Sequence, residues 1–117
     1  MSDIFVFGSN RAGIHGAGAA RFAKLQHGAI WGRGEGLQGN SYGIPTKDHK
    51  IITLPLDQIR AHVAKFLWFA RVNSQLTFDI TPIGCGLAGY KRYQIRPMFD
   101  GMSGNCRFNA TWEDPDL

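Results

Sequence analysis

The sequence predicts a single α/β domain built from layers of strands and helices. The chain has 117 residues and 44% of them are hydrophobic, which suits one domain with a core of its own. Short apolar runs typical of buried strands alternate with helical patterns along the chain. Glycine supplies 15 residues, and its share lies well above the average of ~7%. Ten glycines lie at positions 8–43 and five at positions 84–104, and both blocks follow an apolar run.

The first strand is predicted at residues 4–7, where the sequence is apolar throughout and Gly8 ends the run. A glycine-rich loop follows at residues 8–18. Residues 17–27 favour a helix because alanine recurs in them and Phe22 and Leu25 are also apolar, and Gly28 suits its end.

The middle of the chain is predicted to hold a second glycine loop and another strand. Residues 29–31 are consistent with a short strand or a turn, and residues 32–39 with an irregular loop. Residues 41–46 predict a strand in which Pro45 requires an edge, a strand end or a bulge. Residues 51–54 are mostly apolar and compatible with an extended segment.

The clearest helix is predicted at residues 57–71, and Pro55 just before it suits a helix entry. Its apolar side chains share one helical face: Ile59, Val63, Phe66, Leu67 and Ala70. A strand at residues 78–83 then leads directly into a glycine loop at residues 84–90.

The last part of the chain is expected to hold a short amphipathic helix at residues 92–102 and a final strand at residues 105–109. Three of the nine acidic residues lie in the last five positions. We therefore expect residues 113–117 to form a loose acidic tail after a domain at residues 1–112. The sequence has no internal repeat and no linker.

Composition excludes several classes of protein. The apolar content excludes a disordered or fibrous chain, and no apolar run approaches the ~20 residues that cross a membrane. Residues 1–4 lack the basic and apolar segments of a secretion signal. We therefore expect a cytoplasmic domain with no membrane partner.

The formal net charge of +4 favours an anionic partner such as a nucleotide. Lysine and arginine form no cluster, so a dedicated nucleic-acid binder is not expected. Cys85 and Cys106 have neither the number of a disulfide framework nor the spacing of a metal site. We expect no metal and no other cofactor, and Cys85 is either a reactive thiol or a small buried residue.

Both glycine blocks are expected at the edge of the sheet where ligands bind, because each follows the carboxyl end of a strand. The first block also opens a helix, whose free N–H groups and dipole attract an anion. Gly13, Gly16 and Gly18 do not have the spacing of a dinucleotide-binding fingerprint, and no P-loop lysine follows them. The expected site therefore holds an anionic ligand with backbone groups.

Four segments together resemble a macrodomain: Phe7-Gly8-Ser9-Asn10, Gly16-Ala17-Gly18-Ala19-Ala20, Ile44-Pro45-Thr46-Lys47 and Pro82-Ile83-Gly84-Cys85-Gly86-Leu87. They occur in macrodomain order and span most of residues 4–100. The chain is most similar to the branch of the terminal ADP-ribose protein glycohydrolases, and it also resembles short macrodomain-like proteins of bacteria and phages. The resemblance implies a three-layer α/β/α fold with a mixed central sheet. It also implies binding of ADP-ribose or of a related ADP-ribose-derived nucleotide, including signalling nucleotides.

The resemblance further implies which residues hold this ligand. Asn10 is expected beside the distal ribose, residues 16–19 around the diphosphate, and residues 84–90 in a second phosphate and ribose loop. The expected ligand-binding residues are Gly8, Ser9, Asn10, Gly16, Ala17, Gly18, Ala19, Gly84, Cys85, Gly86, Leu87, Ala88, Gly89 and Tyr90.

Lys47 matches the lysine that this branch uses as a nucleophile on the distal ribose, although a solvated turn lysine fits the surrounding sequence equally well. The branch also needs an acid after Ile-Gly-Cys-Gly-Leu, where this chain has Ala88, which cannot transfer a proton. His15, as a helper of Lys47, and Asp48 or Glu35 are the candidates for the missing group. An activity as an ADP-ribosyl hydrolase or an ADP-ribose 1″-phosphate phosphatase using Lys47 is therefore left open.

Four further residues each have two interpretations. Trp31 and Tyr42 either stack on an adenine or belong to the core. Tyr90 either contacts the ligand or packs under the following helix. Asp79 either orients the second loop or is a structural carboxylate.

A small interaction protein is the remaining interpretation, and it leaves the oligomeric state open. Trp68, Phe69 and Trp112 would then form the contact face, because exposed apolar residues gathered in a patch suit a partner.

Overall fold

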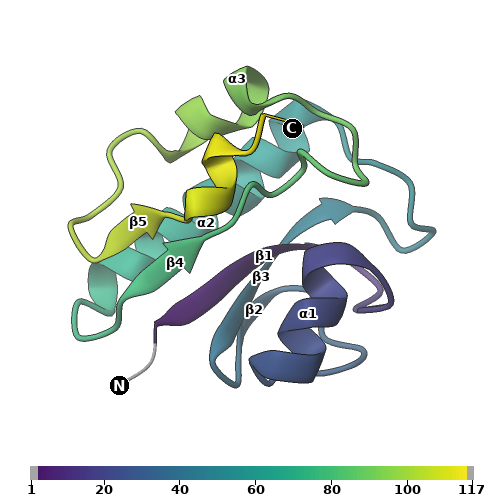
Figure 1. Cartoon of the computed structure of the whole chain (residues 1–117), viewed down its shortest axis with the longest axis horizontal. Coiled ribbons are helices and arrows are strands. Elements are labelled where there is room, and N and C mark those ends of the chain that lie inside the picture. The colour runs from purple at the N-terminus through teal and green to yellow at the C-terminus, as the bar shows by residue number, and fades with distance from the viewer. Residues whose placement is uncertain (1–2, 116–117) are drawn as a thin grey trace.

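A computed structural model of the chain describes residues 3–115, whose central feature is a five-stranded sheet in the order β2-β3-β1-β4-β5. Four of the strands run parallel: β1 (Ile4–Asn10), β3 (Ser41–Lys47), β4 (Phe78–Ile80) and β5 (Cys106–Phe108). The edge strand β2 (Gly36–Gln38) pairs with β3 in the antiparallel sense, so the sheet is mixed (Figure 1).

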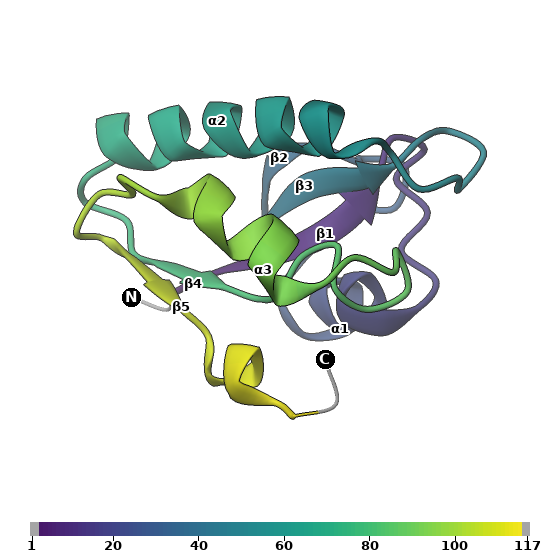
Figure 2. The same cartoon turned by 90° about the horizontal axis from the view of Figure 1, so that it is seen from above.

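Helices cover both faces of this sheet. The helix α1 (Gly18–Gln26) lies on one face, and α2 (Leu56–Val72) lies on the other, as Figure 2 shows. A short helix α3 (Arg92–Ile95) and the 3-10 helix η1 (Arg96–Phe99) also lie on the α2 side, and a second 3-10 helix η2 (Ala110–Glu113) follows β5. The predicted α/β domain is thus confirmed, with three layers.

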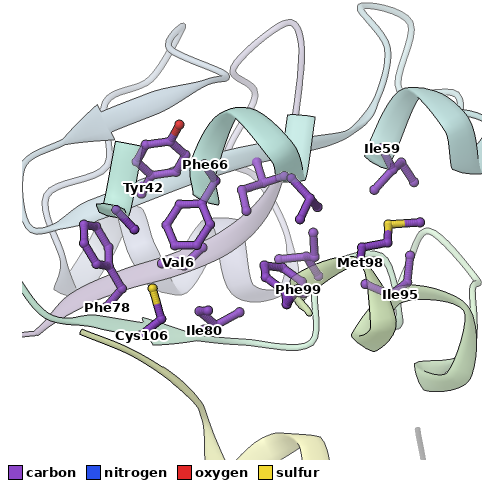
Figure 3. Packing of buried hydrophobic residues seen from close by; sticks show 14 of the residues in the cluster. Val6, Tyr42, Ile59, Phe66, Phe78, Ile80, Ile95, Met98, Phe99 and Cys106 are labelled. Atoms are coloured by element: carbon purple, nitrogen blue, oxygen red, sulfur yellow. The ribbon is translucent and has the colours of Figure 1, made fainter. Parts of the chain in front are cut away.

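The apolar run of the first strand serves both layers, because successive side chains of a strand point to opposite faces. Ile4 and Val6 pack on the α2 side, where the larger cluster of buried residues lies (Figure 3). Phe5 and Phe7 pack on the α1 side against its alanines. Burial of each large apolar side chain contributes ~1.5–3 kcal/mol, and burial on both faces explains why β1 lacks polar alternation.

Pro45 lies where a proline is tolerated in a strand, as the sequence analysis expected. It sits beyond the three residues of β3 that pair with β2, so its missing N–H costs no hydrogen bond on that side. On the other side the register with β1 shifts between Ser9 and Asn10, which places an extra residue, Thr46, in β3. This bulge turns the ends of both strands at the carboxyl edge of the sheet.

Several element boundaries differ from the predictions. Of the two alternatives for residues 29–31, the structure has the turn, which the Arg33 N–H closes on the Ile30 carbonyl at 3.0 Å, and the expected loop at residues 32–39 contains β2. The strand expected at residues 78–83 ends at Ile80. The helix expected at residues 92–102 is instead α3 followed by η1, because Pro97 lies where an α-helix would need its N–H.

The end of the chain is more ordered than a loose tail up to residue 115. Glu113 completes η2, and its carboxylate lies 3.8 Å from the Arg96 guanidinium. Asp116 and Leu117 lie outside the described residues. Across residues 3–115, no helix is long and apolar enough to cross a membrane.

Candidate functional site

A cavity of about 850 Å³ lies between the start of α1, the loop after β4 and the C-terminal segment. It opens beyond the carboxyl ends of β1 and β4, the edge at which open α/β sheets bind ligands. Its walls include most of the expected ligand-binding residues: Gly8, Ser9, Asn10, Gly16, Ala17, Gly18, Ala19, Gly84, Gly86, Leu87 and Ala88. The two glycine loops, far apart in sequence, therefore share one cavity.

Four of the expected site residues lie outside the cavity wall. Gly89 belongs to the loop but does not line the cavity. Tyr90 donates a hydrogen bond from its hydroxyl to the Leu54 carbonyl at 2.7 Å, so it ties the loop to the segment before α2. Cys85 is buried, and desolvation raises its thiol pKa to about 11, which keeps the sulfur protonated at neutral pH.

His15, the fourth of these residues, is buried in the loop layer behind the cavity. Only 1% of its surface is exposed, its ring meets Phe7 edge-on at 5.4 Å, and Nε2 lies 3.0 Å from the Arg33 carbonyl oxygen. Within residues 3–115, its Nδ1 has no hydrogen-bond partner. His15 is therefore a buried structural residue that connects the first glycine loop to the segment around Arg33.

The start of α1 presents free N–H groups to the cavity. The N-cap residue is Ala17, which has no side-chain oxygen to accept from them, and the first turn contains no acidic residue. The positive end of the helix dipole therefore faces the cavity with no acidic residue in the first turn of the helix itself. Gly18 adopts a φ of 56° that favours glycine, and an added Cβ there would lie 3.5 Å from Leu87 of the opposite loop, an ordinary van der Waals distance.

The loop after β4 is held by hydrogen bonds that do not use all of its N–H groups. Thr53 donates a hydrogen bond from its hydroxyl to the Ala88 carbonyl at 3.1 Å. The N–H of Tyr90 donates to the Gly84 carbonyl at 2.9 Å. No hydrogen bond among the described residues engages the N–H groups of Gly86, Leu87 and Ala88. These groups form a second set of donors beside the cavity.

Lys47 supplies the positive side-chain charge of the cavity wall. It ends β3, and its carbonyl accepts a hydrogen bond from the Arg11 N–H at 2.9 Å. Its ammonium forms no ion pair within residues 3–115. An unpaired ammonium at the end of a rigid strand is suited to attract an anionic group of a ligand.

The polar side chains at the end of β1 shape the first loop. The Asn10 amide nitrogen donates to the Ile14 carbonyl at 2.8 Å, and its oxygen accepts from the Ile14 N–H at 2.9 Å. Ser9 donates a hydrogen bond to the Gly34 carbonyl. The Asn10 amide is thus already paired at both ends, so its first role in this geometry is to fold the loop.

The acids named as substitutes for a residue at position 88 lie elsewhere. Asp48 caps its own turn by accepting from the N–H groups of Lys50 and Ile52 at 2.8 and 3.0 Å, and the hydrogen bond from Ile52 is the main cause of its lowered pKa. Glu35 lies 2.5 Å from His62 Nδ1 and 3.3 Å from the Lys65 ammonium. Neither carboxylate lines the cavity.

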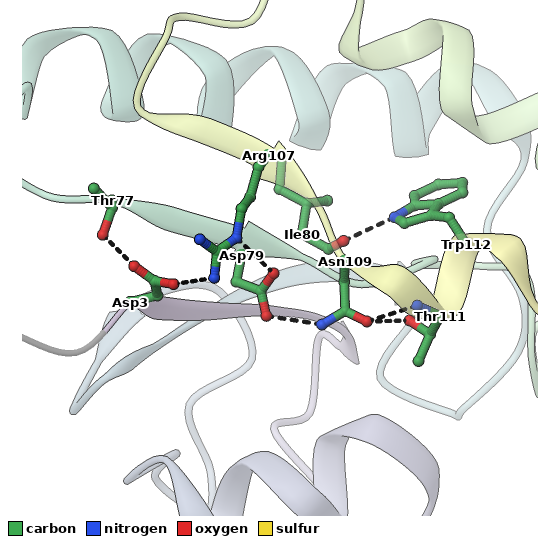
Figure 4. A network of polar contacts seen from close by, with 8 residues as sticks. All are labelled: Asp3, Thr77, Asp79, Ile80, Arg107, Asn109, Thr111 and Trp112. Carbon is green, nitrogen blue, oxygen red and sulfur yellow. Dashed lines mark hydrogen bonds and ion pairs between the residues drawn. The ribbon is translucent and has the colours of Figure 1, made fainter.

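The C-terminal segment forms a wall that the sequence analysis missed. Asn109, Thr111 and Asp114 all line the cavity. Asn109 accepts hydrogen bonds from the Thr111 N–H and hydroxyl at 2.8 and 2.6 Å, and it donates to Asp79 at 2.7 Å (Figure 4). The available signal was Asn109 itself, because asparagine is favoured at the N-cap of a helix, where its side chain accepts from a backbone N–H.

Asp79 and Tyr42, which each had two interpretations, both contact other parts of the protein and do not line the cavity. The Asp79 carboxylate holds the C-terminal segment through Asn109 and lies 3.4 Å from the Arg107 guanidinium nitrogen, so it does not touch the second loop through these bonds (Figure 4). Tyr42 is buried in the core on the α2 side, where burial, aided by the charge of Glu35, raises its pKa to about 12.

The remaining aromatic candidates differ in their exposure. Trp31 is 57% exposed and does not line the cavity, whose aromatic wall is formed by Phe5 and Phe22. Trp112 is buried, and its indole N–H donates to the Ile80 carbonyl at 2.7 Å, so the contact face expected to include it is not present in that form. Trp68 alone of that expected face is strongly exposed, at 60%.

The glycines between positions 28 and 43 allow backbone segments to touch. An added Cβ at Gly13 would lie 2.2 Å from the Gly32 carbonyl carbon, and one at Gly34 would lie 2.2 Å from the Asn10 carbonyl oxygen. At Gly39 it would lie 2.6 Å from the Gly28 carbonyl oxygen. None of the glycines at positions 28–43 lines the cavity, so their role in the structure is to let backbone segments pack closely.

No metal site is apparent in the part of the chain that the structure describes, because no three His, Cys, Asp or Glu side chains there are arranged to hold an ion.

Comparisons with known proteins give a match in fold only. No protein-family model and no curated protein matches the chain. The chain is similar to the solved structure of a protein of unknown function from Bacteroides thetaiotaomicron, with a TM-score of 0.51 and 18% identity over 85% of this chain and 80% of that one.

Proposed function

We propose that the cavity binds ADP-ribose or a related ADP-ribose-derived nucleotide. The observation that carries this proposal is the position of two sets of backbone donors on one cavity: the uncapped start of α1 and the N–H groups of Gly86, Leu87 and Ala88. A diphosphate has oxygens on several sides and is well matched by donors from two directions. The resemblance of the same segments to macrodomains supports this choice of ligand.

The dimensions and the charge of the cavity agree with a nucleotide. Its volume of about 850 Å³ lies within the range of ~300–1,000 Å³ common for small-molecule sites. Lys47 adds one positive charge at the end of β3. The wall is otherwise largely apolar, which lowers the local dielectric constant and strengthens each hydrogen bond to a phosphate.

Isothermal titration calorimetry with ADP-ribose, cyclic ADP-ribose isomers and NAD tests the proposal. Ala17→Asp should abolish binding, because an aspartate at this N-cap accepts the free N–H groups and places a negative charge where the diphosphate would lie. Gln26→Asp, at the last residue of the same helix, adds the same charge away from the cavity and should bind normally. The absence of heat with every nucleotide, from folded protein at a concentration that detects micromolar binding, would refute it.

A hydrolase acting on ADP-ribosyl linkages or on ADP-ribose 1″-phosphate is the second candidate function. It is favoured by Lys47, which lines the same cavity and whose ammonium forms no ion pair within residues 3–115. A deprotonated lysine amine is a nucleophile toward the C1″ carbon of the distal ribose. Against it stand Ala88 at the expected acid position and the involvement of Asp48 and Glu35 in other contacts.

Turnover of a labelled ADP-ribosylated peptide and of ADP-ribose 1″-phosphate separates the two candidates. A hydrolase that uses Lys47 loses its activity in both Lys47→Ala and Lys47→Arg, because neither side chain has a nucleophilic amine. A pure binding protein shows no turnover, and Lys47→Arg then keeps most of the affinity. Turnover that persists in Lys47→Ala would exclude chemistry by this residue.

A further inference from the structure

Ile51 adopts a backbone conformation that isoleucine rarely takes. Its φ of 64° lies in the left-handed region, and among residues 3–115 every other residue with a positive φ is a glycine. A β-branched side chain makes this conformation costly, because its Cβ crowds the backbone. The side chain at position 51 is therefore present against a local penalty that glycine would not incur.

The turn that contains Ile51 explains this conformation. The Asp48 N–H donates to the Ile52 carbonyl at 2.8 Å, and the Ile51 N–H donates to the Asp48 carbonyl at 3.2 Å. This pattern makes residues 49–51 a three-residue hairpin loop, in which the last residue is left-handed and is usually glycine. The Asp48 carboxylate reinforces the turn by accepting from the N–H groups of Lys50 and Ile52.

Burial in the protein does not offset the penalty at Ile51. The residue belongs to neither cluster of buried side chains among residues 3–115, and 39% of its surface is exposed. It lines the cavity instead, as Lys47 does at the start of the same turn. The segment after the turn is fixed to the cavity wall, since the Thr53 hydroxyl donates to the Ala88 carbonyl at 3.1 Å. The turn therefore holds an apolar side chain rigidly at the cavity.

We propose that Ile51 packs on an uncharged part of the bound nucleotide, the C–H face of a sugar, beside the anionic group that Lys47 attracts. The inference rests on the proposed nucleotide binding. It adds a residue that lowers the stability of the free protein and raises its affinity for the ligand. Strained residues of this kind concentrate at ligand contacts, where the contact offsets a penalty that the free protein carries. Apolar contact with the ligand removes the exposed part of Ile51 from water.

Thermal unfolding and calorimetry with ADP-ribose test the proposal in Ile51→Gly. Tm should rise by about 2–5 °C because the strain is removed, and the affinity should fall about fivefold or more because the apolar contact is lost. Ile51→Asn should act in the same way without adding the flexibility of glycine, because asparagine tolerates the left-handed region and is polar. Ile51→Leu keeps an apolar side chain and should bind within about twofold of the native protein.

Ile52→Gly is the matched control. Ile52 is 61% exposed, does not line the cavity and has no positive φ. The same substitution there should lower Tm, because glycine gains freedom in the unfolded chain, and it should leave the affinity unchanged. The two neighbouring positions are thus expected to respond in opposite directions in stability and to differ in binding.

The outcomes distinguish this proposal from nucleotide binding itself. A Tm that falls in Ile51→Gly overturns the strain argument. An affinity for ADP-ribose that survives in both Ile51→Gly and Ile51→Asn overturns the ligand contact and leaves nucleotide binding standing. Equal losses of affinity in Ile51→Gly and Ile52→Gly assign the effect to the turn as a whole and also overturn the role of the side chain. Failure of the folded native protein to bind any of the nucleotides overturns nucleotide binding, and the ligand contact of Ile51 with it.

Discussion

Gly13 illustrates how a single glycine supports the site without touching a ligand. Its φ of 72° lies in the left-handed region, and an added Cβ would lie 2.2 Å from the Gly32 carbonyl carbon. Both effects penalise any other residue at this position. The glycine therefore belongs to the contact between the first loop and the segment at residues 30–33.

Gly13→Ala should lower the free energy of unfolding by about 2 kcal/mol or more, because strain and a backbone clash add. Urea unfolding followed by circular dichroism measures the change. Gly104→Ala is the matched control, since Gly104 has an ordinary φ and open space around it, and it should change stability by less than ~1 kcal/mol. Equal losses in both variants would contradict the close-approach argument.

Cys85 should be chemically inert despite its place in a glycine loop. Because burial raises its thiol pKa to about 11, the thiolate is scarce below that pH and the alkylation rate should still be rising above pH 9. Mass spectrometry after iodoacetamide treatment at pH 8 should find Cys85 mostly unmodified in the native protein and fully modified in urea. Rapid native labelling at pH 7 would indicate an accessible, activated thiol instead.

The C-terminal segment acts as an element because one asparagine organises it. Asn109 caps η2, donates to Asp79, and so holds residues 109–114 against the end of β4. Trp112 adds a buried ring and a hydrogen bond to the Ile80 carbonyl. The wall at this end of the cavity therefore depends on contacts between β4 and residues about thirty positions later.

Asn109→Ala should destabilise the protein by ~1–2 kcal/mol, through loss of the cap and of the hydrogen bond to Asp79. It should also weaken nucleotide binding, because the wall that it holds becomes loose. Thermal unfolding and calorimetry measure the two effects. Asn105→Ala is the contrasting variant. The Asn105 amide donates to the carbonyls of Ala70 and Leu76 near the end of α2, far from the cavity. This variant should therefore be less stable to unfolding but should keep its affinity for the nucleotide.

In the molecule as a whole, the cavity joins segments that lie far apart in the chain. The cavity wall includes residues of β1, α1, β3, the loop after β4 and the segment after β5. A ligand bound there links all of them, so it should stabilise the fold as a unit. Ligand-linked stabilisation grows with the ratio of ligand concentration to Kd.

ADP-ribose at about 100 times its Kd should stabilise the protein by ~2.7 kcal/mol and raise Tm by several degrees. Differential scanning fluorimetry measures the shift. Hydrogen exchange should slow together in residues 8–20, 84–90 and 109–114, which are distant in sequence. Ala17→Asp should show neither effect, and protection confined to the first loop would argue for a smaller ligand site.

Much of the architecture was predictable from local patterns. Three signals are local, because each can be recognised from neighbouring residues alone. They are the apolar run at residues 4–7, the helical face that includes Ile59 and Phe66, and the glycines that follow β1 and β4. The short strand β2 escaped prediction because its three residues pair only through contact with β3. Pro97 was visible, yet the extent of the helix before it depended on packing at Ile95 and Phe99.

Local patterns in the sequence were enough to predict the alternation of strands and helices and the two glycine-rich loops, because periodicity and glycine placement depend on only a few neighbouring residues. Only the folded chain shows that Asn109, Thr111 and Asp114 line the cavity and that His15 is buried outside its wall. Those facts depend on pairings such as Phe5 with Asp79 and Asp79 with Asn109. Contacts between residues so far apart leave no periodic signal in the chain, so only the folded sheet brings them together.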